Sequence, residues 1–65
     1  MTTIEIARVK RNGAKNRMEM ARQFLAQSDA FHLYRLSEVI ETMRSYEREG
    51  LLVITDTELI LNHTI

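Results

Sequence analysis

Residues 36–61 read LSEVIETMRSYEREGLLVITDTELIL, and the fold prediction rests mainly on this stretch. The pattern predicts a helix over residues 37–49, with Ser37 as its N-terminal cap. Gly50 follows, and a glycine at that point readily adopts the left-handed conformation that ends a helix. The helix is inferred from apolar residues at the spacing that lines one side of a helix: Leu36, Val39, Ile40, Met43 and Tyr46.

The second half of the stretch predicts a β-hairpin. Two apolar runs, 51–55 and 58–61, flank a polar turn, and short apolar runs around a turn are typical of paired strands. Both faces of this hairpin would be apolar. We therefore expect helices against one face and a partner or an N-terminal strand over the other. One face would carry Leu52, Ile54, Leu59 and Leu61, and the other Leu51 and Val53.

Upstream, the apolar spacing predicts a first helix over residues 14–27. Residues 2–9 are rich in β-branched side chains and favour a short strand or extended arm. Thr2 and Glu5 also fit the capping box of a helical turn. Residues 30–36 fit one helical turn, a short strand or the front of one long helix. We prefer a break before Ser37, because serine is more favourable at the start of a helix than inside it.

Length and composition limit the class of protein. A chain of 65 residues is expected to form a single domain (1–65), with an arm over 1–13, a body over 14–61 and a loose tail over 62–65. The chain has no cysteine, hence no disulfide and no thiolate metal site. It also has no apolar run of membrane-spanning length and no hydrophobic signal core. We expect a cytoplasmic protein with no membrane partner.

Charge is unevenly distributed along the chain, although the net charge is zero. Residues 1–28 carry six Lys and Arg against two Glu, and residues 29–65 carry three Arg against seven Asp and Glu. The two halves therefore have charges of +4 and −4. Such polarity can steer an anionic partner, or let two copies meet head to tail, or simply mark solvated surfaces.

The sequence SEVIETMRSYEREGLLVI from Ser37, followed by a hairpin, resembles the recognition helix and wing of winged helix-turn-helix domains. The resemblance covers residues 36–61. It implies an α+β, winged-helix-like fold with two main helices (14–27 and 37–49) before a C-terminal hairpin (51–55 and 58–61). In that arrangement, residues 29–34 would form a shortened second helix. It also implies DNA binding and a role in transcription regulation.

The charges depart from that family pattern. The helix over 37–49 is net acidic, and the hairpin tip carries Asp56 and Glu58. Proteins that bind duplex DNA normally present a basic surface to the phosphates. If the chain binds DNA, we therefore expect non-specific phosphate contacts from the basic N-terminal half: Arg8, Lys10, Arg11, Lys15, Arg17 and Arg22.

No set of residues predicts catalysis. The two histidines lie far apart in sequence without metal-ligand spacing, and both glycines are explained by a turn or a cap. We expect no catalytic residue, no metal and no cofactor.

Two functions remain. One is a DNA-associated regulator. The other is a protein-interaction module or homodimer that modulates a larger partner, as small phage or plasmid-encoded proteins do. For the second function, the residues expected at the partner interface are Phe31, Tyr34, Leu51, Val53 and Ile60.

Overall fold

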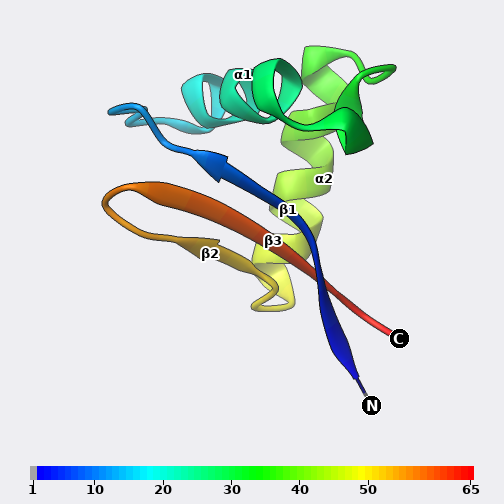
Figure 1. Ribbon diagram of the computed structural model, residues 1–65. Coiled ribbons are helices and arrows are strands. Elements are labelled where there is room, and N and C mark those ends of the chain that lie inside the picture. Colours follow the sequence, from blue (N-terminus) through cyan, green and yellow to red (C-terminus); the bar gives the residue numbers. More distant parts are fainter. Residues whose placement is uncertain (1) are drawn as a thin grey trace.

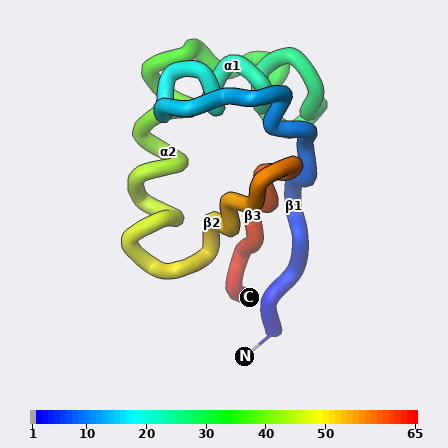
Figure 2. Tube along the Cα trace, turned by 90° about the vertical axis from the view of Figure 1, so that its left-hand side faces the viewer, coloured from blue at the N-terminus to red at the C-terminus, as the bar shows by residue number. Residues whose placement is uncertain are grey.

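The computed structural model describes residues 2–65, and Met1 lies outside the described residues. The chain folds as a small α+β domain in which β3 is the central strand of a three-stranded antiparallel sheet, in the order β1-β3-β2. Both helices lie on one side of the sheet, and no described element covers its other face (Figures 1 and 2). The elements are β1 (Thr3–Lys10), α1 (Arg17–Gln27), the 3-10 turn η1 (Asp29–Phe31), α2 (Leu36–Arg48), β2 (Leu52–Ile54) and β3 (Glu58–Thr64).

The winged-helix-like fold expected from the resemblance is wrong. The C-terminal hairpin is part of a larger sheet, because the eight-residue β1 pairs along β3. The segment proposed as a second helix contains only η1, a three-residue turn. The expected loose tail over 62–65 is also wrong, because β3 continues to Thr64 and the Ile65 amide donates to the Thr2 carbonyl at 2.8 Å. The order strand, helix, helix, strand, strand does agree with the expected N-terminal strand, two helices and hairpin; what differs is that the N-terminal strand joins the hairpin in one sheet.

The helix starts differ from the predicted ones for identifiable reasons. Helix α1 begins at Arg17 rather than residue 14, because the Asn16 side chain caps it by accepting from the Glu19 amide at 2.9 Å. Helix α2 begins at Leu36, so Ser37 is not its cap. There the Glu38 carboxylate reaches back to accept from the Arg35 amide at 2.8 Å. A third-position glutamate thus satisfies a free donor at this helix end.

The turns predicted at Gly13 and Gly50 are present in the structure. Asn12 and Gly13 have φ values of +51° and +76°, and the Ala14 amide donates to the Arg11 carbonyl at 3.0 Å, which closes the turn. Gly50 has a φ of +74° at the end of α2, as expected for a helix-ending glycine. These turns direct β1 into α1 and α2 into β2.

The core lies between the sheet and the helices. Leu59 and Leu61 of the central strand are fully buried and pack with Phe24, Val39 and Met43 from the two helices. The predicted sharing of faces in the hairpin is confirmed, since Leu52 pairs with Leu61 and Ile54 with Leu59. The opposite face of the sheet therefore carries the alternate residues of each strand.

Candidate interaction surface

A β-bulge in β1 controls which side chains reach the open face of the sheet. The register against β3 shifts between Glu5 and Ala7, so Ile6 is the extra residue. Side chains normally alternate between faces, which would place residues 5 and 8 on opposite sides. The extra residue instead places both Glu5 and Arg8 on the open face.

One half of the open face is charged. Glu5 accepts from Arg8 Nε at 2.5 Å, and Glu58 of β3 accepts from Arg8 Nη1 at 2.9 Å. The hydrogen bond and charge of Glu5 raise the pKa of Arg8, with Glu58 adding to the effect. The Arg8 guanidinium thus forms ion pairs with two carboxylates of its own chain.

The other half of the open face is apolar. Val53 of β2 lies directly opposite Ile60 of β3, and the Asn62 amide donates to the carbonyl of Leu51 at 2.9 Å. Val53 is 41% exposed, and Leu51 and Ile60 are half-buried. We call Leu51, Val53 and Ile60 the apolar strip. It reaches the β2 edge of the sheet.

The β1 edge is closed at its end by a side chain of α1. The amide of Gln27 accepts from the Lys10 backbone N–H at 2.8 Å and donates to the Lys10 carbonyl at 2.9 Å. It therefore occupies both backbone groups that a neighbouring strand would use. Together with the bulge and the charged Arg8, this contact makes β1 a poor template for another strand.

The β2 edge has none of these protections. The Leu51 carbonyl and the Thr55 amide bond to β3, so by alternation the backbone groups of Leu52 and Ile54 point away from the sheet. No charged side chain occurs from Leu51 to Thr55, and Ile54 is 39% exposed. The β2 edge and the apolar strip together form one surface that an added strand would fit.

Three of the six basic residues expected to contact DNA are bonded to groups of the same chain. Arg8 and Arg17 are ion-paired, with Glu58 and Glu47 among their partners. Arg11 donates from Nε to the Ala14 carbonyl at 2.6 Å and from Nη1 to the Thr55 carbonyl at 3.0 Å. The remaining three make no ion pair within residues 2–65: Lys10, Lys15 and Arg22.

Of the five expected interface residues, only three gather in one place, and they are the apolar strip. Phe31 is 3% exposed and packs edge-on against Phe24 with ring centres 5.4 Å apart, so it belongs to the core. Tyr34 is exposed and packs edge-on against Phe31, with ring centres 5.0 Å apart. Phe24, Phe31 and Tyr34 thus form a row of edge-on aromatic contacts from the core to the surface beside η1.

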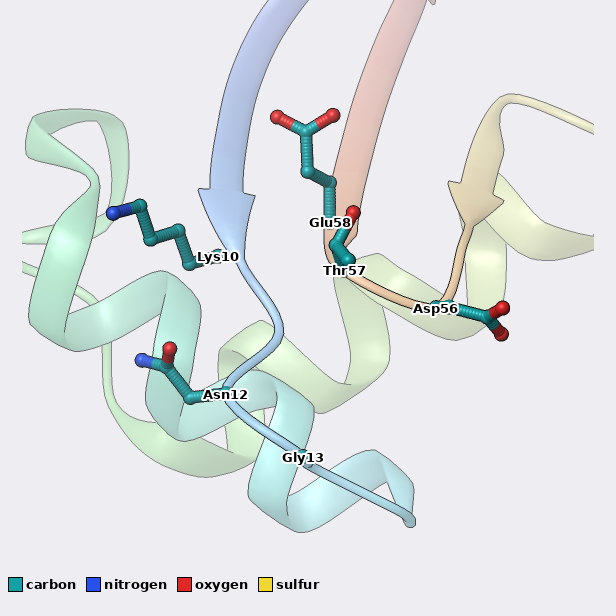
Figure 3. A pocket seen from close by; sticks show the side chains of 6 residues that line it. All are labelled: Lys10, Asn12, Gly13, Asp56, Thr57 and Glu58. Carbon is teal, nitrogen blue, oxygen red and sulfur yellow. The ribbon is translucent and has the colours of Figure 1, made fainter.

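An open hollow lies between the 11–14 turn and the β2–β3 turn (Figure 3). Its side chains diverge: Lys10 and Asn12 point to one side, Glu58 to another and Asp56 away from both (Figure 3). Asn12 is held by Gln23 of α1, to which its amide donates at 3.1 Å. The lining residues therefore converge on no common point where a substrate would be held. Within residues 2–65 no three His, Cys, Asp or Glu gather as metal ligands.

No family model, curated protein or solved structure matches the chain. No helix in the described part of the chain is long and apolar enough to cross a bilayer. Sequence reasoning missed the bulge at Ile6 and the role of Gln27. Both depend on how β1 lies against β3 and α1, which no local sequence pattern records.

Proposed function

We propose that this domain is a small, non-enzymatic protein-binding module that docks a partner chain on the β2 side of its sheet. The observation that carries the proposal is the difference between the two sheet edges. Gln27 and the bulge obstruct β1, whereas β2 presents unprotected backbone groups beside an apolar strip. Exposed apolar edges of this kind pair readily with added strands.

The proposal places the module in the cytoplasm, because a chain without cysteine has no need of an oxidising compartment. A DNA-associated role has less support. Half of the cations expected to contact phosphates are held by carboxylates or carbonyls of the same chain. Affinity for duplex DNA grows with the number of cations available to the phosphates.

Site-specific photocrosslinking in the cells that encode the protein tests the proposal. A photoreactive benzoylphenylalanine replaces Val53, and in a matched control it replaces Ile4, which is equally exposed at 41% but lies in β1. We expect a discrete protein adduct from position 53 and none from position 4. The adduct should disappear when Ile54→Lys adds a charge at the β2 edge.

The adduct at position 53 counts in favour of the module whether the captured protein is a second copy or another chain. Equal yields from positions 53 and 4, or persistence of the adduct in the Ile54→Lys background, would overturn the proposal. Circular dichroism of each variant confirms that the domain remains folded before the yields are compared.

A further inference from the structure

We infer that the occupant of the β2 edge is a second copy of this chain, paired antiparallel to the first across a two-fold axis at Val53. The inference rests on the proposed function and adds the identity of the partner. Three properties of this edge support it: the pairing geometry, the side chains and the charges.

The backbone geometry of β2 is self-complementary. The residues whose backbone N–H and C=O groups point away from β3 are Leu52 and Ile54, on either side of Val53. A two-fold axis at Val53 places Leu52 of one copy opposite Ile54 of the other, and the reverse. Each such pair exchanges both backbone hydrogen bonds in an antiparallel ladder. All the free backbone groups of this short edge are then satisfied.

The side chains match in the same register. Val53 of one copy faces Val53 of the other in a non-hydrogen-bonded pair, the arrangement in which cross-strand side chains approach most closely. Both valines lie on the open face beside Ile60. The two apolar strips therefore join into one across the axis. On the inner face, Leu52 of each copy covers the partly exposed Ile54 of the other.

The charges around β2 favour a neutral occupant. No charged side chain occurs from Leu51 to Thr55. The edge strand itself is therefore uncharged. A strongly acidic or basic segment gains little from such a surface. A second copy brings an uncharged strand and a net charge of zero, so no net repulsion opposes it.

The size of the edge sets the strength of the dimer. A stable interface takes about 800 Å² from each partner, which is a large share of the 4510 Å² surface of this domain. A three-residue edge with one apolar strip supplies less than that. The dimer should therefore dissociate on dilution and form at high protein concentration.

A disulfide at the two-fold axis tests the inference. Opposed residues in a non-hydrogen-bonded pair have Cα atoms about 4.5 Å apart, within the range that a disulfide spans. The chain has no cysteine, so Val53→Cys introduces a single thiol, and Ile4→Cys provides a control of equal exposure. Under mild oxidation we expect Val53→Cys to form covalent dimers at least about tenfold faster than Ile4→Cys.

A second measurement uses the unmodified chain. Its sedimentation coefficient should rise with concentration, and Ile54→Lys should remove that rise. Equal crosslinking rates for the two cysteine variants, or a concentration-independent coefficient, would overturn the second copy as occupant. If the photocrosslink at position 53 then still captures a different protein, the binding function stands and only its partner is wrong. If that photocrosslink also fails, both proposals fall.

Discussion

Gly50 forms the junction between α2 and β2, with a φ of +74°. A Cβ atom added at this position would meet no other atom within 4 Å, so steric clash with neighbours contributes nothing to a substitution. Gly50→Val should therefore destabilise the domain through backbone conformation alone, by about 1–2 kcal/mol. For a domain of this size, each kcal/mol lowers Tm by about 4–8 °C in thermal unfolding.

Gly50→Asn is the matched control, because asparagine tolerates the left-handed conformation better than β-branched residues do. We expect its Tm to fall between those of the wild type and Gly50→Val. If Gly50→Val melts at the wild-type temperature, the left-handed junction does not exist in solution.

Arg11 is a structural residue rather than a free cation. Its half-buried guanidinium donates to the carbonyls of Ala14 and Thr55, which ties the 11–14 turn to the end of β2. Arg11→Ala should lower the free energy of unfolding by about 1–2 kcal/mol, because both carbonyls lose a charged donor. Urea denaturation measures the loss. Lys15→Ala is the control, since the Lys15 side chain makes no hydrogen bond or ion pair across residues 2–65. Equal stability of the two variants would contradict the structural role of Arg11.

The β1 edge is expected to depend on one side chain of α1. Gln27→Ala removes both contacts with the Lys10 backbone. Loss of one hydrogen bond of about 1 kcal/mol corresponds to roughly five- to tenfold faster exchange of the Lys10 amide proton, which hydrogen-exchange NMR measures. Arg22→Ala is the control, because Arg22 is an exposed α1 residue whose side chain contacts Met18 and not Gln27 or Lys10. Unchanged exchange at Lys10 in Gln27→Ala would show that water protects this edge equally well.

The elements differ in how far the sequence alone predicts them. The β2–β3 hairpin follows from alternation, since Leu52 and Ile54 do share the buried face with Leu59 and Leu61. Gly50 likewise marks the end of α2. These features are local: each depends on residues only a few positions apart.

The non-local features could not be predicted in this way. The partner of β1 lies about fifty residues away in β3, so nothing near residues 3–10 records the pairing. The bulge at Ile6 and the Gln27 contact both depend on that pairing. The fold inferred from the family resemblance was wrong for a related reason, because a helix followed by a hairpin occurs in folds whose remaining elements differ. Of the candidate site, the apolar strip was predictable from the hairpin, whereas the protection of the other edge was not.

Across the whole molecule, the two oppositely charged halves of the chain are folded against each other. The Arg8–Glu58 and Arg17–Glu47 pairs each join a cation from residues 1–28 to a carboxylate from residues 29–65. Exposed pairs of this kind contribute little to stability. Their effect is on the external field, because a basic side chain paired within the molecule attracts an anionic partner more weakly.

This internal pairing predicts a shallow salt dependence for any binding to duplex DNA. The slope of log Kobs against log salt concentration is about −0.9 for each phosphate neutralised. Six available cations would give a slope of about −5. The three without internal partners would give a slope no steeper than about −3. These three are Lys10, Lys15 and Arg22.

Fluorescence anisotropy with a labelled duplex of random sequence, titrated at several salt concentrations, measures this slope. The triple variant Lys10→Ala, Lys15→Ala, Arg22→Ala should lose the remaining affinity while keeping the wild-type Tm, because none of the three side chains donates a hydrogen bond to another residue's oxygen or nitrogen among residues 2–65. A slope near −5 in the wild-type protein would mean that Arg8, Arg11 and Arg17 exchange their internal partners for phosphates. In that case the basic half of the chain, and not the β2 edge, would be the principal binding surface.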